Sequence, residues 1–274
     1  MPLKPRLVGG VKGHNMNNNT LPGSPALWAG SFTRDKVSSR TTRNIFALKS
    51  GLMFAMDKTM REAAIDFRYL LNRGYPRIAV LGLAGNRYQL TRDQRHLLHR
   101  GVFSDEDSIS RRKKHVSIKA LCHRDLAIDG YNVLITIEAA LSARPLVLGN
   151  DGFIRDISGL SGHFRKTART EKALELVVRI LKKEKPPRTL FLFDAPMSKS
   201  GRLAQEVRQQ LKGAGLPGEA MAVRVPEEIL IGYPGIVATS DTSIIDQSPQ
   251  VFDLAGHIIK TRIKPASLLT LSQP

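Results

Sequence analysis

Leu126-Ala127-Ile128-Asp129 is a short apolar run that ends on an aspartate, and it decides the fold class of this chain. Residues 190–194, LFLFD, and residues 236–241, IVATSD, repeat the pattern. Continuous apolar runs that are separated by helix-like segments are typical of buried parallel strands. Because an open α/β sheet binds its ligands outside the carboxyl ends of its strands, we expect the three aspartates to meet at one edge.

The remaining pattern after residue 118 predicts an α/β domain with a mostly parallel sheet flanked by helices. Strands and helices alternate, and such alternation favours right-handed crossovers within one sheet. The strands are expected near residues 124–129, 145–149, 188–194, 220–225, 235–239 and 256–260. The helices are expected near residues 132–142, 169–184, 198–213, 226–231 and 241–247.

A small helical unit is predicted before this domain. Apolar residues from Met60 to Leu71 recur at the spacing of one helix face. Thr91-Arg92-Asp93-Gln94 has the spacing of a capping box, and Gly101 is expected to end the helix that this box opens. The expected organisation is a disordered basic tail (1–52), a small helical domain (53–103), a charged linker (104–117), a PIN-like α/β domain (118–264) and a C-terminal tail (265–274).

The chain is strongly basic, with 42 Lys and Arg against 24 Asp and Glu and a formal net charge of +18. The excess is densest before residue 118: residues 1–56 carry 8 basic and 1 acidic residue, and residues 57–117 carry 13 and 7. A basic platform beside an acidic site suits a polyanionic substrate, so RNA, or another nucleic acid, is the expected partner. A basic surface that binds no nucleic acid is the alternative.

Composition and motifs exclude several classes of protein. Hydrophobic residues make up 42% of the chain, but no stretch approaches the roughly 18 apolar residues of a membrane span, so no membrane partner is expected. The sequence shows no secretion signal, and the single cysteine, Cys122, excludes an internal disulfide framework, which favours a cytoplasmic protein. The sequence contains neither a nucleotide-binding glycine motif nor a hydrolase nucleophile elbow. A homo-oligomer is left open.

Three carboxylates at one sheet edge repel one another unless a cation lies between them. Mg²⁺ or Mn²⁺, which prefer hard oxygen ligands, is the simplest such cation, and Asp129, Asp194 and Asp241 are its predicted ligands. A bound ion of this kind neutralises a phosphate and lowers the pKa of an attacking water. The sequence therefore predicts a metal-dependent phosphodiesterase.

Further polar residues near these strand ends complete the candidate site. Asn132 is expected to orient a carboxylate, cap the following helix or contact the substrate. Lys199 is placed near the positive end of a helix, where it can hold a phosphate. A long polar connection supplies Asp156 as an extra catalytic carboxylate and Arg155 as a substrate-binding residue. Ser240 is the remaining substrate-binding candidate.

Asp129-Gly130-Tyr131-Asn132, Phe193-Asp194-Ala195 and Thr239-Ser240-Asp241 together resemble the ordered signature of the NYN branch of PIN-like nucleases. This resemblance covers the later half of the chain. It implies a PIN-like fold in which several carboxylates surround Mg²⁺ or Mn²⁺ and a metal-activated water cuts RNA. By the same resemblance Asp129, Asp194 and Asp241 take the first, central and late acidic positions, and Asp246 takes a frequent last one.

A second acidic position of these nucleases has several competing matches: Glu138, Asp156, Glu171 and Glu175. The leading hypothesis is a metal-dependent ribonuclease whose helical unit grips RNA. The alternative is a catalytically inactive nucleic-acid-binding protein that keeps the PIN-like fold. A phosphatase with an aspartyl nucleophile is the third hypothesis.

From about residue 57 onward the chain also resembles an uncharacterised family of prokaryotic two-domain proteins. The resemblance lies in residues 69–76, 85–88, 129–133 and 155–159 and in the two later aspartate motifs. It implies a helical unit joined to an α/β domain, and it implies no activity.

Overall fold

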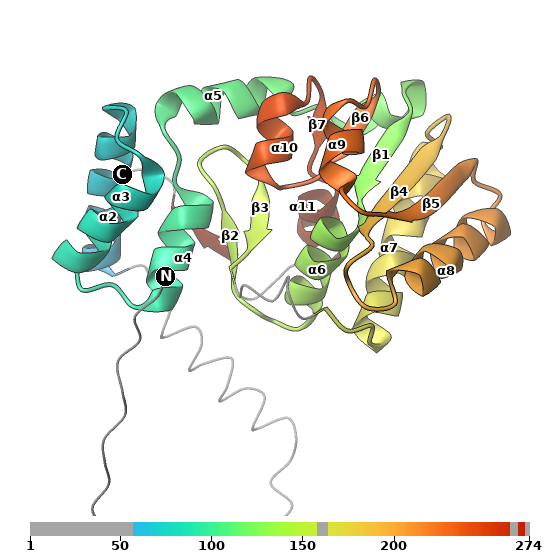
Figure 1. Cartoon of the computed structure of the whole chain (residues 1–274), viewed down its shortest axis with the longest axis horizontal. Coiled ribbons are helices and arrows are strands. Elements are labelled where there is room, and N and C mark those ends of the chain that lie inside the picture. Colours follow the sequence, from blue (N-terminus) through green and yellow to red (C-terminus); the bar gives the residue numbers. More distant parts are fainter. Residues whose placement is uncertain (1–56, 158–163, 264–267, 272–274) are drawn as a thin grey trace, which may run out of the picture. The chain divides into compact units, whose positions relative to one another are not determined.

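Two β-sheets and the helices packed on them make up the part of the chain that this computed structural model describes, residues 57–157, 164–263 and 268–271 (Figure 1). All of these residues belong to one compact unit. The disordered tail predicted at residues 1–52 lies outside the described residues.

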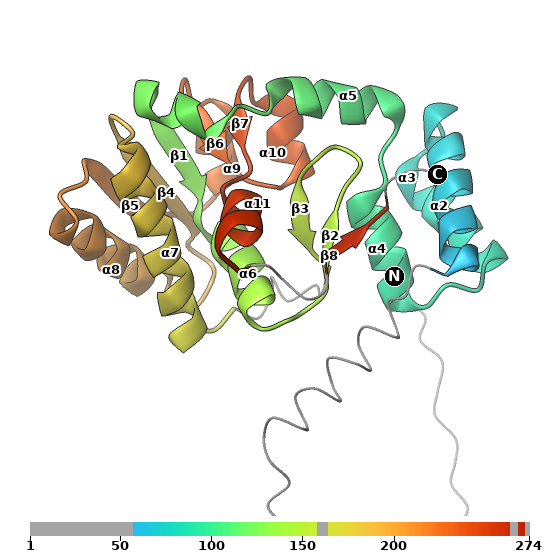
Figure 2. The ribbon, with the colours of Figure 1, turned by 180° about the vertical axis from the view of Figure 1, so that it is seen from behind.

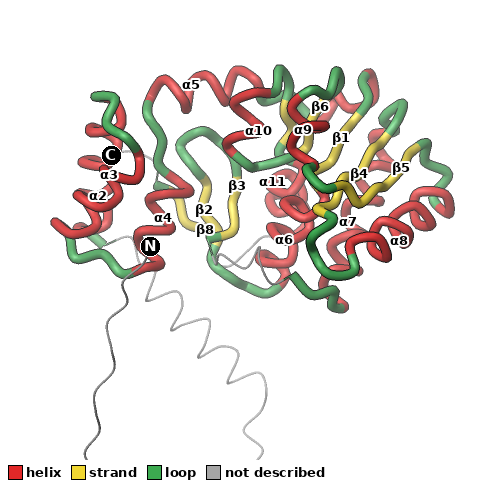
Figure 3. Tube along the Cα trace, in the orientation of Figure 1, coloured by secondary structure: helices red, strands yellow, loops and turns green. Residues whose placement is uncertain are grey.

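The larger sheet has five strands in the order β5-β4-β1-β6-β7, and every neighbouring pair is parallel (Figure 3). β1 is central, since Leu126 pairs with Thr189 of β4 on one side and with Ile236 of β6 on the other. The predicted α/β fold with a mostly parallel sheet is therefore confirmed. The strands are β1 (Leu126–Asp129), β4 (Thr189–Asp194), β5 (Gly218–Val223), β6 (Ile236–Ala238) and β7 (Val251–Phe252).

Helices cover both faces of this sheet because successive side chains of a strand point to opposite sides. Leu126 and Ile128 share one hydrophobic cluster with α6, α7, α8 and α11, whereas Ala127, between them, packs with α9 and α10. α9 and α10 lie in front of the strands in Figure 1, and α7 and α11 lie in front in Figure 2. The helices are α6 (Gly130–Leu141), α7 (Ala168–Glu184), α8 (Ser200–Gly213), α9 (Pro226–Ile231), α10 (Thr242–Gln247) and α11 (Leu254–Ile258).

A smaller sheet has three strands in the order β3-β2-β8. β2 (Leu146–Leu148) is antiparallel to β3 (Ile154–Asp156) and parallel to β8 (Leu268–Thr270). Of the three, β2 was predicted, whereas β3 lies in the predicted long loop and β8 in the predicted C-terminal tail. Strands of three residues carry too short a pattern for periodicity to reveal them.

The helical unit before the larger sheet contains α2 (Lys58–Asn72), α3 (Arg77–Arg87), α4 (Arg92–Gly101) and α5 (Asp105–Lys114), and a 3₁₀ helix η1 (Ile118–His123) leads from it into β1. The capping box predicted for α4 is present, because Thr91 and Gln94 each accept a hydrogen bond from the other's backbone N–H. The hydrophobic core of these helices includes residues of the smaller sheet and its flanks, among them Val147 and Ile157. The helical unit therefore shares a hydrophobic core with the smaller sheet.

Residues 105–114 and 256–260 also differ from the expected local structure. Residues 105–114, expected in a charged linker, form α5 because Ser104 caps it and because its acidic first turn and basic last turn complement the helix dipole. Residues 256–260, expected as a strand, lie in α11 and the π-helical turn η3 (Ile259–Ile263). Asp253 begins α11 by accepting the Gly256 N–H at 2.8 Å, and this cap outweighs the apolar run.

Within residues 57–157, 164–263 and 268–271, no helix combines the length and the apolar character that a membrane span requires.

Candidate active site at the carboxyl edge of the larger sheet

The three aspartates that the sequence singled out follow three adjacent parallel strands. Asp129 is the last residue of β1, Asp194 is the last residue of β4, and Asp241 follows β6 after two residues. Because β4, β1 and β6 are parallel neighbours, their carboxyl ends share one edge. The chain order reverses between β1 and β6, and such a reversal is where open α/β sheets bind their ligands.

Asp129 is the most perturbed carboxyl at this edge. Its Oδ2 accepts the Thr239 hydroxyl at 2.8 Å, and its Oδ1 accepts the backbone N–H of Asn132 at 3.4 Å. Burial raises the pKa of Asp129 to about 7; the two hydrogen bonds oppose this shift, and the charges of Asp241 and Glu227 add to it. A cation at this position would favour the ionised carboxylate.

The turn from β1 into α6 needs a glycine after Asp129. A Cβ on Gly130 would lie 2.8 Å from the Leu192 carbonyl oxygen and would overlap the Phe193 ring. The close approach of this turn to β4 brings the ends of the two strands together. The motif Asp129-Gly130 is thus explained by packing as well as by chemistry.

Asp241 begins α10, and Thr239 connects it to Asp129. The Asp241 Oδ1 accepts the backbone N–H groups of Ser243 at 2.9 Å and Ile244 at 3.3 Å. The Asp241 N–H donates to the Thr239 Oγ1 at 3.1 Å, and that same hydroxyl donates to Asp129. Among the described residues, the Asp241 Oδ2 has no hydrogen-bond partner. One oxygen of Asp241 therefore holds the helix and the other remains available.

Asn132 and Ser240, both predicted to bind substrate, bond to each other. The Asn132 Oδ1 accepts the Ser240 backbone N–H at 2.9 Å and the Ser240 hydroxyl at 3.0 Å. Asn132 thus ties the first turn of α6 to the loop between β6 and α10. In this structure the pair positions the segment that carries Thr239 and Asp241.

Asp194 and Lys199 lie in the connection from β4 to α8. Asp194 is half-buried, and after burial its charge is the second cause that raises the pKa of Tyr131 to about 12. Lys199 is exposed and begins α8 in the left-handed conformation, with a φ of 65°. The two residues flank the same edge as Asp129.

Asp246 and Arg155 take part in a different network. Both oxygens of Asp246 are bound by Arg111 of α5, at 2.6 and 2.8 Å. The Arg155 guanidinium is buried, pairs with both oxygens of Asp151 at 2.9 and 2.7 Å, and donates from Nε to the Ser240 carbonyl at 2.7 Å. These ion pairs hold α5 and β3 against the loop that follows β6.

Asp156, the predicted extra carboxylate, lies in β3 of the smaller sheet. It is buried, and its charge acts on Arg100 of α4. The structure therefore brings Asp129, Asp194 and Asp241 to one sheet edge, whereas Asp156 and Asp246 belong to the contacts around α4 and α5.

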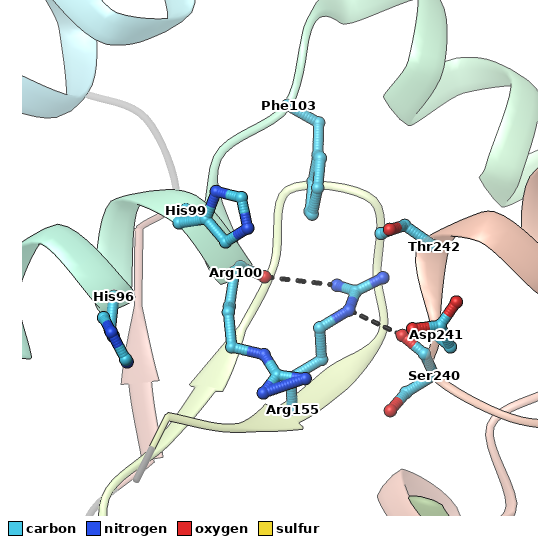
Figure 4. Close-up of a pocket in the computed structure, with 8 residues that line it drawn as sticks. All are labelled: His96, His99, Arg100, Phe103, Arg155, Ser240, Asp241 and Thr242. Atoms are coloured by element: carbon cyan, nitrogen blue, oxygen red, sulfur yellow. Dashed lines mark hydrogen bonds between the residues drawn. The ribbon is translucent and has the colours of Figure 1, made fainter. Parts of the chain in front are cut away.

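A cavity of about 240 Å³ adjoins this edge and was not predicted (Figure 4). From the sequence, its histidines and arginines are expected on the solvent-exposed face of an amphipathic helix. No local spacing of residues indicates that α4 packs against the loop after β6. Figure 4 shows the Arg155 guanidinium in the middle of the site, between the Arg100 and Ser240 carbonyl oxygens. The cavity is lined by His96, His99, Arg100, Phe103, Arg155, Ser240, Asp241 and Thr242.

The donors at the acidic edge suit a hard divalent ion, although they are not a complete cluster. In the described part of the chain, no three His, Cys, Asp or Glu side chains form a group that could hold a metal ion. Mg²⁺ commonly takes one or two direct carboxylates and keeps several waters, so it does not require a group of three such side chains. The charged neighbours that act on Asp129 are the carboxylates Asp241 and Glu227, and a cation relieves their repulsion.

Fold and site together define a two-part α/β protein with aspartates at the sheet edge where strand order reverses. Residues 118–257 match the family described as Domain of unknown function (DUF5616), and the chain belongs to this family. Residues 59–114 match the family described as Protein of unknown function (DUF434). The predicted membership of an uncharacterised two-domain family is confirmed, and neither description states an activity.

A similar protein is found in an archaeon. The chain is 32% identical over 204 residues to the uncharacterized protein MJ0935 of Methanocaldococcus jannaschii, and the match covers 74% of this chain and 97% of that protein. No solved structure matches the chain.

Proposed function

We propose that this protein is a metal-dependent ribonuclease of the PIN-like type, which hydrolyses phosphodiester bonds at the acidic edge of its larger sheet. The observation that carries the proposal is the convergence of Asp129, Asp194 and Asp241 at the carboxyl ends of three adjacent parallel strands. The strand-order reversal at β1 and β6 supports the same location, since ligands of open α/β sheets bind there.

The hydrogen bonds of the residues at this edge indicate which carboxylate oxygens are free to bind a cation. Thr239 occupies Oδ2 of Asp129, so Oδ1, whose contact with the Asn132 N–H is long at 3.4 Å, is the oxygen most free to hold a cation. Asp241 offers Oδ2 while its Oδ1 caps α10. Asp194 is placed on the other side of β1 to act directly or through water. When bound, Mg²⁺ or Mn²⁺ supplies charge neutralisation at the phosphate and a water of lowered pKa.

The basic charge of the helical unit supports RNA as the substrate. Residues 57–117, which form the helical unit, carry 13 basic and 7 acidic residues. Phosphate contacts by Lys and Arg supply most of the sequence-independent affinity for a nucleic acid. The helical unit is therefore proposed to hold the strand while the aspartates act on one phosphodiester.

A second candidate function is nucleic-acid binding without cleavage. It is favoured by one observation, namely that the described residues contain no preformed group of three metal-ligand side chains. It predicts tight RNA binding that is insensitive to Mg²⁺ and Mn²⁺.

Cleavage of labelled single-stranded RNA by the full chain tests the proposal, with Mg²⁺, with Mn²⁺ and with EDTA. We expect metal-dependent cleavage that Asp129→Asn and Asp194→Asn each reduce by several orders of magnitude, because each removes an anionic oxygen from the metal site. Asp125→Asn is the matched control, since Asp125 precedes the same strand at its opposite end, and it should cleave like the wild type.

Two results would contradict the proposal. Cleavage that survives both Asp129→Asn and Asp194→Asn would place the reaction elsewhere or assign it to a contaminant. RNA that is bound but left intact under every metal condition would replace the nuclease by the second candidate.

A further inference from the structure

The cavity between α4 and the loop after β6 has no role in the proposed chemistry, yet it shares a wall with the acidic edge. Ser240, Asp241 and Thr242 form one side of it, and His96, His99 and Arg100 of α4 form the other. We propose that this cavity is a subsite for a phosphate group, bound by Arg100 with His96 and His99. The assignment of this phosphate to the RNA strand rests on the proposed function. The binding of an anion in the cavity does not depend on that function.

The charge around Phe103 favours an anion here. The guanidinium carbons of Arg77, Arg111 and Arg155 lie 4.6, 4.4 and 4.9 Å from the centre of the Phe103 ring. The ring itself lines the cavity. Three cations around one aromatic ring produce a concentration of positive charge at the cavity wall.

Carboxylates compensate only part of this charge. Asp151 pairs with both Arg111 and Arg155, and Asp246 pairs with Arg111. Arg77 donates to the carbonyl oxygens of His99 and Val102, both at 2.9 Å, and no described carboxylate lies within ion-pair distance of it. The carboxylates of Asp107 and Asp151 act on Arg77 only from beyond that distance, so a bound anion adds to a charge that is only partly compensated.

The groups that face the cavity also repel one another in the absence of an anion. Burial lowers the pKa of His99, and the charges of Arg77, Arg100 and His96 lower it further. A phosphate beside these groups reverses the effect, because it attracts each of them. Burial and the charge of Arg155 lower the pKa of Arg100, and the charges of Asp156 and Asp241 oppose this shift.

The size of the cavity fits a small anionic group. About 240 Å³ is below the roughly 300–1,000 Å³ of typical pockets for drug-sized ligands, so a phosphate with part of its sugar fits better than a whole nucleotide. Asp241 belongs both to the cavity wall and to the acidic edge. An RNA strand that occupies the cavity therefore passes over the acidic edge. The geometry thus gives the proposed substrate two anchoring points.

Titration calorimetry of the metal-free full chain in EDTA with inorganic phosphate tests the subsite. We expect the wild type to bind phosphate, and Arg100→Gln and His99→Gln to weaken binding by roughly tenfold or more, since each loses a charge-assisted hydrogen bond. Arg92→Gln is the control, because Arg92 is exposed on the same helix and does not line the cavity. Circular dichroism of each variant checks the fold, and Arg100→Lys should restore part of the affinity.

Equal phosphate affinity in the wild type, Arg100→Gln and His99→Gln, or no binding by the wild type, would overturn the subsite. A parallel titration with an RNA oligonucleotide identifies the source of the phosphate: a matching loss of RNA affinity assigns it to the strand, and unchanged RNA affinity assigns it to a small phosphate ester. If the protein binds phosphate but cleaves no RNA, the proposed nuclease function is refuted and the phosphate subsite is retained.

Discussion

Thr239 is the residue that links the ends of β1 and β6. Its hydroxyl donates to Asp129 at 2.8 Å and accepts the Asp241 N–H at 3.1 Å, while its side chain is buried. The parallel register of the two strands explains this contact. Ala238 pairs with Ile128 in the parallel register, so the next residue along β6 faces the end of β1.

Thr239→Val keeps the shape of the side chain and removes both hydrogen bonds. The pKa of Asp129 lies near 7 although the Thr239 bond lowers it, so the substitution should raise that pKa further. A folded-state pKa above the unfolded value means that stability is complete below the unfolded pKa and is lost as the pH rises through the folded pKa. The loss caused by Thr239→Val, about 1–3 kcal/mol, should therefore be larger at pH 9 than at pH 5.

Urea denaturation of the metal-free protein at the two pH values measures this difference. Thr242→Val is a suitable control, because Thr242 directly follows Asp241 and its side chain makes no hydrogen bond with Asp129 or Asp241. An equal loss at both pH values would show that Thr239 does not stabilise the ionised Asp129.

At the scale of elements, Asp151 joins α5, β3 and the loop after β6. It is fully buried, binds Arg155 and Arg111, and also accepts the Phe153 N–H at 3.3 Å. Arg155 in turn donates to the Ser240 carbonyl at 2.7 Å, so this one carboxylate supports the segment that carries Asp241. The network decides where α5 lies relative to the acidic edge.

Asp151→Asn should destabilise the protein by about 3–5 kcal/mol, since it leaves two buried guanidinium groups without their shared counter-charge. Burial alone would raise the pKa of Asp151, but the charges and hydrogen bonds of Arg155, then the charge of Arg111, lower it below its ordinary value. A lowered folded-state pKa stabilises the fold above the unfolded pKa, and this contribution is lost as the pH falls through the folded value.

The stability difference between wild type and Asp151→Asn should accordingly shrink between pH 7 and strongly acidic conditions. Chemical denaturation across this range measures it. Asp246→Asn is the matched control: it removes the other, exposed partner of Arg111 and should cost about 1 kcal/mol or less. If Asp246→Asn destabilised the protein as much as Asp151→Asn, this result would contradict the assigned difference in burial.

At the scale of the whole molecule, the helical unit and the α/β part match two different families but share one hydrophobic core. Val147 and Ile157 pack in the same cluster as Met60, Leu97 and Leu98 of α2 and α4. The Arg111–Asp246 pair and the Lys114 ammonium, which donates to the Ile245 carbonyl at 3.1 Å, add polar contacts between α5 and α10. Separate boundaries in sequence therefore do not mean separate folding units.

A fragment that begins at residue 118 and lacks α2 to α5 should lose this shared core. We expect the full chain to unfold in one cooperative transition over residues 57–271, and the fragment to show a broad transition at a much lower temperature, because it exposes Val147 and Ile157. Scanning calorimetry of both proteins measures the difference. A fragment that melts at the temperature of the full chain would refute the shared core.

The sequence alone determined where β1, β4, β5 and β6 and most of the helices around them lie along the chain. Apolar runs placed β1, β4 and β6, a capping box placed α4, and the aspartates that follow the runs were assigned to one edge. These features are encoded within a few neighbouring residues, because strand alternation and helix caps act over one or two turns of chain.

Only the tertiary structure decided what lies around that edge. The contacts of Arg111 with Asp246 and of Arg155 with Ser240 join residues 135 and 85 positions apart, and the cavity appears only where α4 meets the loop after β6. The short strands β3 and β8 likewise exist only because β2 pairs with both. Such contacts depend on how distant elements pack, and no local pattern of residues specifies the angle at which two surfaces meet.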